Sequence, residues 1–432
     1  MIKKFKENIF SNSFYILFTF ALIKMLYSQL SVGFEKESWQ ITEWLINYEG
    51  GFVRRGLSGE AILKLYTHFG ISPYYLIVYF CLICYLALIA FFVYSFIKKE
   101  YPLFILPLVF FLGEPVLNNY WVRKDVFLML ILIVILYCLR KKSALSLVLI
   151  NLLFITSILM HEAIGFIGLP VALLILMNKE KAIQSNHSFI QLFIAAATKL
   201  IPSIAALFIC LYYKGTPPIA LKIWNSWVPI QFPTQSDDIY SIPASIDGIR
   251  WTLQEGLFYS KAVFTNFADD IYAPIVWTLT FILIFYFLTN INKLNVRISK
   301  FRQYVNFNKL NISNVLIFQF LMIIPLFILG WDYGRWTFFW VTSSFAIFII
   351  VPEEQLSALF PKFISAMSLK LTAFLDSIFI KPQYIIYIIP LFLGLSACSR
   401  DFTVAYLSTP VVVTIQFVTN WIHILFSAIG II

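Results

Sequence analysis

Charge, histidine and cysteine are all scarce in this chain. Asp, Glu, Lys and Arg make up only 12% of the 432 residues and 60% are hydrophobic, which excludes a soluble globular domain and predicts a membrane protein. The five cysteines lie in or beside apolar runs, without the spacing of a disulfide framework or a zinc site. We expect them to be small buried hydrophobic residues, and we expect neither a metal nor a cofactor.

Motifs for nucleotide binding and for secretion are missing as well. The sequence has no Walker A motif and no dinucleotide-binding glycine pattern, which argues against an ATP-driven pump unless a partner supplies the ATPase. The first apolar run has no nearby small-residue cleavage site, so we expect a membrane span and not a removable signal peptide. The formal net charge of +10 is attributed to membrane orientation and not to nucleic-acid binding.

What the chain has instead is a series of apolar runs that approach the roughly 20 residues needed to cross a bilayer. We predict an all-α, polytopic integral membrane protein with about 12 transmembrane helices, folded as a single membrane domain (1–432). The predicted spans are 13–32, 73–97, 102–113, 126–139, 143–160, 162–177, 189–213, 273–290, 313–330, 336–351, 383–397 and 409–431.

The basic residues predict the orientation of these spans. With both termini cytoplasmic, the inner segments hold 18 Lys/Arg and 6 acids, whereas the outer segments hold 12 Lys/Arg and 16 acids. This arrangement gives two larger extracytoplasmic loops, 33–72 and 214–272, an inner basic loop, 291–312, and an inner amphipathic segment, 354–381. The richness in Phe, Ile, Lys and Asn suggests a bacterial gene, and therefore the cell inner membrane.

Four polar clusters lie at the predicted outer ends of the spans, where arginine is normally avoided. The first contains Glu49, Arg54 and Arg55 among four glycines, an arrangement suited to bidentate binding of phosphate. The alternative is that both arginines extend to lipid headgroups or pair with nearby glutamates. The second cluster is Arg123, Lys124 and Asp125; the alternative there is a helix-end anchor with a local ion pair.

The third cluster, His161 and Glu162, interrupts a long apolar run. Such a pair is costly at that depth unless it is partnered, so we predict His161 as a general base and Glu162 as its orienting group or a ligand for a hydroxyl. A hydrogen-bonded helix contact is the alternative. The fourth cluster, Asp332 and Arg335 in a short outer turn, either joins an anion site or forms an ion pair across the turn.

Tryptophans accompany acidic residues in the second outer loop. Trp224, Trp227 and Trp251 alternate with aspartates, a composition suited to sugar rings because aromatic faces stack on C–H groups and carboxylates accept hydroxyl hydrogen bonds. An aromatic belt at the membrane interface explains the same residues. Helices packed in one bundle would bring the four clusters around a single cavity that opens to the outside.

The segment from Asn119 to Pro170 resembles the middle of EpsG/Wzy-like polysaccharide polymerases, with Arg123 opening one span and His161 closing the next. The first outer loop, with its acidic residue and amphipathic stretch, is similar to that of GT-C glycosyltransferases. The chain departs from the polymerase pattern in having Glu162 after His161 and in its Gly-Gly-Phe-Val-Arg-Arg-Gly element.

The resemblance implies an enzyme that joins undecaprenyl-pyrophosphate-linked repeat units on the outer face of the membrane, in O-antigen, capsule or exopolysaccharide synthesis. Its substrate is then a lipid-linked oligosaccharide, and membrane lipids, a chain-length regulator and a flippase are its expected partners. In this hypothesis Arg54, Arg55, Arg123, Lys124 and Arg335 hold the pyrophosphate, Asp125 and Asp332 support them, and His161 or Glu49 removes the acceptor proton.

Two alternatives remain. One is a GT-C transferase that moves a single sugar from a polyprenyl monophosphate, with an acid in 33–60 as the base. The other is a transporter or a flippase for lipid-linked oligosaccharides, which would need polar residues spread across the bilayer midplane. The spans carry little charge there beyond Lys24 and Lys199, which argues against transport.

Overall fold

The computed structural model describes most of the chain between residues 38 and 379 and one C-terminal helix. The described ranges are 38–101, 120–141, 143–183, 186–230, 243–252, 254–258, 272–291, 295–298, 301–304, 307–330, 332–379 and 410–428, with a few single positions before 38 and at 232. The predicted spans 102–113 and 383–397 lie outside the described residues, as does most of 13–32.

The described part of the chain is helical, apart from one antiparallel hairpin of β1 (Asn295–Ile298) and β2 (Phe301–Tyr304). Eight predicted apolar runs coincide with helices. These are α4 (Pro73–Lys98), α6 (Lys124–Arg140), α7 (Ala144–Met160), α8 (Ala163–Ile183), α14 (Tyr272–Thr289), α15 (Lys309–Leu329), α16 (Tyr333–Ile350) and α21 (Pro410–Ala428).

Three of these helices, α4, α8 and α15, are long and apolar enough to cross a membrane. Two further helix pairs qualify if each bent pair counts as one span: α9 (Phe189–Lys199) with α10 (Ile201–Tyr212), and α17 (Glu353–Leu359) with α18 (Lys362–Ile378). Long apolar helices of this kind indicate a multi-pass membrane protein. The number of twelve spans and their orientation stay predictions.

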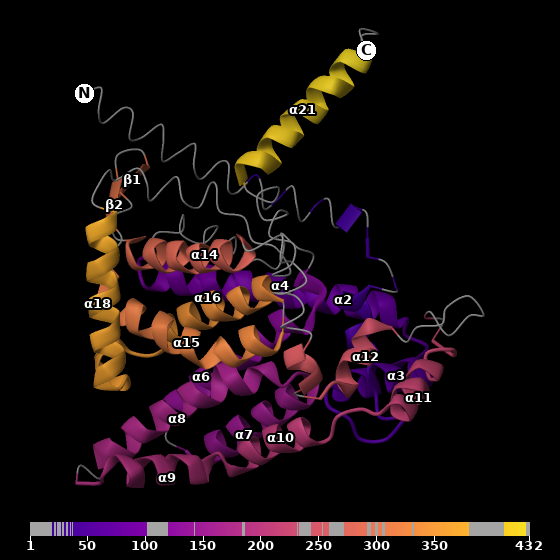
Figure 1. Cartoon of the computed structure of the whole chain (residues 1–432), viewed down its shortest axis with the longest axis horizontal. Helices are drawn as coiled ribbons and strands as arrows, with labels where there is room; N and C mark the ends of the chain where they lie inside the picture. The colour runs from indigo at the N-terminus through magenta and orange to yellow at the C-terminus, as the bar shows by residue number, and fades with distance from the viewer. Residues whose placement is uncertain are drawn as a thin grey trace.

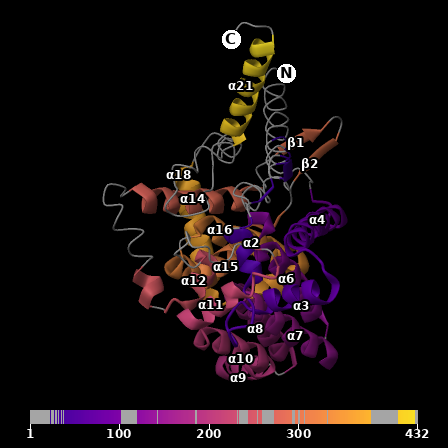
Figure 2. The ribbon, with the colours of Figure 1, turned by 90° about the vertical axis from the view of Figure 1, so that its right-hand side faces the viewer.

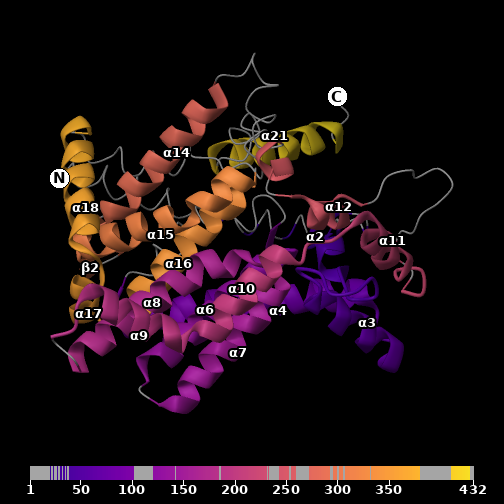
Figure 3. The same cartoon turned by 60° about the horizontal axis from the view of Figure 1, so that its bottom comes forward.

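Helix α16 is the centre of the bundle, and all of its side chains are buried. It packs against α15 and α6, which lie along it in Figures 1 and 3. Its Thr and Ser residues are small enough to let neighbouring helices approach closely, as is usual between membrane helices. The helix ends at Val351 because Pro352 disfavours helical geometry in the residue before it.

The predicted inner segments are more ordered than loops. Within 291–312, the hairpin precedes α15, whose start is capped by the Asn308 side chain accepting from the backbone N–H of Asn311 at 3.2 Å. The predicted amphipathic segment 354–381 forms α17 and α18, which meet at 99°. Figure 1 shows α18 running across the ends of α14, α15 and α16, as expected of a helix on a membrane surface.

The two predicted outer loops fold into one helical cap. Residues 38–72 contain α2 (Trp39–Thr42), the 3-10 helix η1 (Glu43–Leu45) and α3 (Leu57–Phe69), and residues 214–252 contain α11 (Pro217–Asn225) and α12 (Ala244–Arg250). The Trp227 indole donates to the Leu45 carbonyl at 3.1 Å and so joins the two halves. The cap lies to the right in Figure 1, over the end of the bundle where α6, α8 and α16 begin, which we call the polar end. In Figure 2, α21 stands apart from the bundle.

Candidate active site

A glycine-rich turn in the cap positions the first pair of arginines. The backbone N–H of Gly59 donates to the Ile46 carbonyl at 3.1 Å, and a Cβ at Gly59 would lie 2.1 Å from that oxygen. Only glycine therefore permits this contact between α3 and the chain after η1. Arg55 has φ 66°, a left-handed conformation that costs a non-glycine residue about 1–3 kcal/mol and is found mostly at functional sites.

The two arginines contact the third cluster. Arg55 forms a bidentate ion pair with Glu162, with its Nε 2.9 Å from Oε2, while Nη1 of Arg54 lies 3.7 Å from Oε1. Arg54 also donates from Nη2 to the Gly248 carbonyl at 2.7 Å, and its backbone N–H donates to Tyr213. Both arginine side chains are largely buried, and neither is paired with Glu49 or Glu60 in the structure.

The second cluster connects all the others. The Lys124 ammonium donates to the carbonyls of Arg55 and Met160, at 3.3 and 3.2 Å. Arg123 pairs with Glu43 in the cap and lies 3.5 Å from the Asp332 carboxylate. Asp125 makes no local ion pair with its neighbours, because its carboxylate is bound by an arginine of α16.

That arginine is Arg335, in the fourth cluster. It donates to Asp125 through Nε and Nη2, both at 2.7 Å, and to Asp332 through Nη1 at 2.7 Å. The predicted ion pair across the turn, between Arg335 and Asp332, is thus present, but it is one contact within a larger network. Nη2 of Arg335 also lies 3.5 Å from Nε2 of His161, so all four clusters are in contact.

The network contains four arginines, four carboxylates and one lysine. The ion pairs balance, because Arg54, Arg55, Arg123 and Arg335 pair with Glu43, Asp125, Glu162 and Asp332, whereas the Lys124 ammonium donates to two backbone carbonyls. Most of these side chains are almost fully buried. Breaking one of these buried ion pairs would be costly, so the network holds its arginines at fixed positions around the polar end.

Two glutamates, Glu43 in the cap and Glu162 in the link between α7 and α8, have pKa values set by this surrounding charge. Burial alone raises the pKa of Glu162, but Arg55, His161 and Arg54 outweigh it and hold that pKa well below the usual range. Glu43 behaves in the same way, because Arg123 and Arg335 outweigh the effect of burial on its pKa. Both carboxylates are therefore ionised at neutral pH and hold arginines in place.

His161 lies in the link between α7 and α8, and its side chain is buried. Burial, followed by the positive charge of Arg55, lowers its pKa well below the usual value, so the ring is neutral at pH 7. Nδ1 accepts the backbone N–H of Ala163 at 3.2 Å, and Nε2 faces Arg335. Because Nδ1 accepts this N–H, the proton of the neutral ring lies on Nε2, so neither ring nitrogen has a free lone pair and His161 is a weak candidate for a general base.

A cavity of about 660 Å³ lies at the polar end, within the size range of ligand sites in proteins. Its lining combines residues of the cap with residues near the polar ends of α8, α10, α15 and α16. Among them are Trp39, Arg54, Arg55, His161, Glu162, Lys214, Trp251, Asp332, Arg335 and Trp336. Lys214 is exposed and marks the solvent side. The walls combine cations, two carboxylates and three indoles, which is a set of groups suited to recognising phosphate and sugar rings together.

Three N–H groups of the lining are buried without a hydrogen-bond partner among the described residues. They are Nε of Arg54, Nε1 of Trp39 and Nε1 of Trp336. An unsatisfied buried donor costs about 1–3 kcal/mol, so such groups usually await a ligand or water.

One candidate base is not in the cavity. Glu49 does not line it, and its backbone N–H donates to the side chain of Asn47. The most accessible carboxylate of the network is instead Asp332, whose side chain is 23% exposed, against 9% for Glu162 and 2–3% for Asp125 and Glu43. Asp332 is therefore the carboxylate best placed to meet a substrate.

The sequence reasoning missed Glu43 and Trp39. Both belong to the short helices of the cap, and only the acid within Trp39–Leu45, surrounded by apolar residues, hints at burial. Among the loop tryptophans, Trp251 lines the cavity, whereas Trp224 and Trp227 are 2% and 0% exposed and pack inside the cap. Trp224 and Trp227 therefore present no face to a sugar or to the membrane interface.

Comparisons with known proteins do not identify the function of this site. The chain matches no protein-family model, no curated protein and no solved structure. What the cavity can bind and do therefore follows from its own residues.

Proposed function

We propose that this protein is a membrane glycosyltransferase that takes a glycan from a polyprenyl-phosphate-linked donor in the cavity at the polar end. The observation that carries the proposal is the combination of three arginines, three indoles and unsatisfied N–H donors at the residues around one cavity. Phosphate oxygens would accept from Arg54 and the indole N–H groups, and sugar rings would stack on tryptophan faces. Lys214 adds a further charge on the solvent side.

The chemistry needs only one proton acceptor and stabilisation of a leaving phosphate. An acceptor hydroxyl attacks the anomeric carbon and gives its proton to the Asp332 carboxylate. The C–O bond to the donor phosphate breaks, and the phosphate keeps the electron pair as an additional negative charge. Arg54, with Arg55 and Arg335 behind it, stabilises that charge in a partly desolvated site. His161 and Glu162 orient the arginines in this scheme.

The first candidate within this class is the polymerase. The sequence resemblance favours transfer of whole repeat units from undecaprenyl pyrophosphate, and the cavity volume leaves room for more than a phosphate. The second candidate is a GT-C transferase of single sugars, favoured by the buried acid Glu43 in the first cap segment. Product analysis separates the two, because a polymerase lengthens chains and a single-sugar transferase adds one residue.

Transport is less well supported. The charged residues of α6, α8, α15 and α16 lie near helix ends, and α7 contains none. A transporter would instead place polar binding groups near the midplane. The predicted orientation puts the polar end outside the cell, so we place the reaction on the outer face of a bacterial inner membrane, beside a flippase and a chain-length regulator.

The proposal is tested by measuring the chain length of the surface glycan in a strain whose glycan synthesis depends on this gene. The variants Arg54→Ala and Asp332→Asn should abolish chain extension while the protein remains in the membrane at normal abundance. A matched control is Lys64→Ala, at an exposed ion pair on α3 away from the cavity. Normal-length glycan from both cavity variants would show that the proposed mechanism is wrong.

A further inference from the structure

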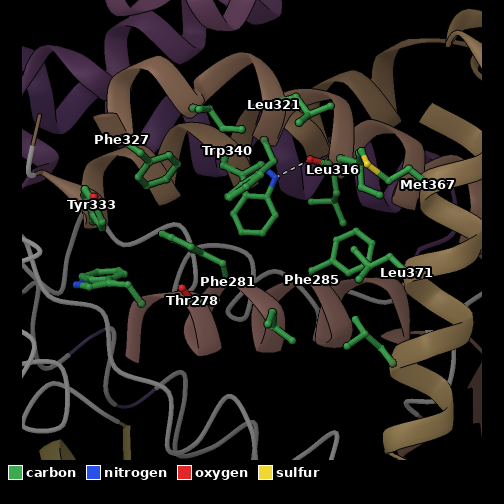
Figure 4. A pocket seen from close by; sticks show the side chains of 16 residues that line it. Thr278, Phe281, Phe285, Leu316, Leu321, Phe327, Tyr333, Trp340, Met367 and Leu371 are labelled. Carbon is green, nitrogen blue, oxygen red and sulfur yellow. Dashed lines mark hydrogen bonds between the residues drawn. The ribbon is translucent and has the colours of Figure 1, made fainter. Parts of the chain in front are cut away.

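A second cavity lies inside the bundle, away from the charged network. It measures about 530 Å³ and is bounded by α14, α15, α16 and α18. Figure 4 shows Phe327 and Tyr333 at one end, Phe281 and Trp340 in the middle, and Leu371 at the other end. Nearly all of its lining is hydrocarbon, so it is a groove for an apolar ligand.

The aromatic walls of this groove are fixed by mutual packing. The Phe281 ring lies 4.9 Å from Phe327 and 6.1 Å from Trp340, and Phe320 lies 5.1 Å from Trp340. Trp340 is held by a hydrogen bond from Nε1 to the Leu316 carbonyl at 2.8 Å, drawn in Figure 4. Its polar atom is thereby satisfied, and the ring presents only apolar surface to the groove.

The groove and the charged cavity meet at one turn. Phe327 and Tyr333 line the groove, whereas Leu326, Gly330 and Asp332 from the same turn between α15 and α16 line the charged cavity. A molecule that occupied both would need a charged head joined to a long hydrocarbon chain. From Leu316 to Phe327, the α15 wall extends about 16 Å at 1.5 Å per residue, much of the depth of a bilayer.

We propose that this groove binds the polyprenyl chain of the lipid-linked phosphate whose head occupies the charged cavity. The inference rests on the proposed function, and it adds a binding site for the lipid part of the substrate. Because neighbouring residues of one turn line the two cavities, the arrangement suits a lipid with a phosphate head better than a free sugar phosphate. An ordinary phospholipid or another segment of this chain is the competing occupant, and the experiments below distinguish them.

A bulky substitution in the groove provides the first test. Leu321→Trp, with its side chain in the groove, is compared with Ile328→Trp, on the same helix but 52% exposed and outside both cavities. Each protein is assayed with a long-chain polyprenyl donor and with a short-chain donor bearing the same head. The kcat/KM ratio of long to short chain should fall about tenfold in Leu321→Trp, the loss expected when roughly two methylene contacts are excluded.

In Ile328→Trp the ratio should stay at the wild-type value. Because each ratio is measured within one protein, partial misfolding affects both donors equally and does not imitate the effect. Equal ratios in the wild type and Leu321→Trp would overturn the proposal.

The second test needs no catalytic activity. The wild-type protein in nanodiscs is photolabelled with a polyprenyl phosphate that carries a diazirine on its chain, and labelled peptides are identified by mass spectrometry. Labelling of α14 and α15 that unlabelled polyprenyl phosphate displaces supports the groove, even if no transferase activity is found and the proposed function fails. Labelling elsewhere, or labelling displaced equally by a phospholipid of similar chain length, would overturn it.

Discussion

Arg335 in α16 holds both carboxylate oxygens of Asp125 at the start of α6, each at 2.7 Å. Both side chains are 2% exposed. The pair joins two helices that are more than 200 residues apart in sequence and fixes the distance between the turn after α15 and the second charged cluster. It also orients Arg335, whose remaining nitrogen reaches Asp332 in the cavity wall.

The first prediction concerns the stability of this pair. Asp125→Asn should lower the free energy of unfolding by about 3–5 kcal/mol, because it leaves a buried guanidinium without its counter-charge. Thermal unfolding of the purified protein in detergent measures the effect. The control is Asp376→Asn, whose ion pair with Lys309 is about one-third exposed and should contribute no more than about 1 kcal/mol. Equal effects of the two substitutions would contradict the structural role of Asp125.

The second prediction separates the two neighbouring arginines. Arg54→Ala should reduce transferase activity about 10²–10³-fold and lower the melting temperature less than Arg55→Ala does, because its side chain makes one hydrogen bond, to the Gly248 carbonyl, and lies 3.7 Å from Glu162. Arg55→Ala should lower the melting temperature more, because the buried Glu162 loses its bidentate partner. Activity and melting temperature are measured on the same preparations. Matching profiles for the two variants would mean that the division of roles is wrong.

The third prediction identifies the proton acceptor. Asp332→Asn should lower kcat about 10²–10⁴-fold, the range for removal of a general base. His161→Gln should lower kcat less, since both nitrogens of the ring already contact protein groups. Rates are compared at saturating donor, so that weaker binding does not contribute. A larger loss in His161→Gln than in Asp332→Asn would reverse the assignment.

The fourth prediction is a dependence of stability on pH. The pKa of His161 is lowered in the folded protein, so its ring stays neutral where an unfolded chain would bind a proton. The contribution of His161 to the free energy of unfolding is therefore fully present above about pH 6.5. It falls as the pH drops, by about 1.4 kcal/mol at about pH 5.5. The lowered pKa values of Glu43 and Glu162 act only below their unfolded value of 4.5, whereas Lys124, whose pKa burial lowers to about 7, also titrates in this window.

Melting temperatures at about pH 7.5 and pH 5.5 measure this dependence. The difference between them should shrink in His161→Gln, because glutamine does not titrate. An unchanged difference would show that His161 does not carry the pH dependence.

The helices of the bundle could be predicted because each is encoded by its own stretch of sequence. Each of α4, α6, α7, α8, α15 and α16 is a continuous apolar run, and the observed ends differ from the predicted ones by a few residues. The cap could not be predicted in the same way. Its helices α11 and α12 are only 9 and 7 residues long, too short to be stable alone, and contacts such as Trp227 with Leu45 hold them.

The site residues could be predicted as polar exceptions at helix ends, but their partners could not. Arg55 was expected to meet phosphate or Glu60, and it binds Glu162, more than 100 residues away. Asp125 was expected to neutralise its neighbours, and it binds Arg335. Such pairings depend on which helices are adjacent, information that a single sequence does not carry. Glu43 was missed for the same reason, because only its contact with Arg123 distinguishes it from other acids.

Equilibrium binding of labelled undecaprenyl pyrophosphate to the purified protein in nanodiscs tests the central claim most directly. The account predicts saturable binding to the wild type, weakened about tenfold or more in Arg54→Ala and unchanged in the exposed-pair variant Lys64→Ala. Binding that is absent from the wild type, or equal in the wild type and Arg54→Ala, would contradict it.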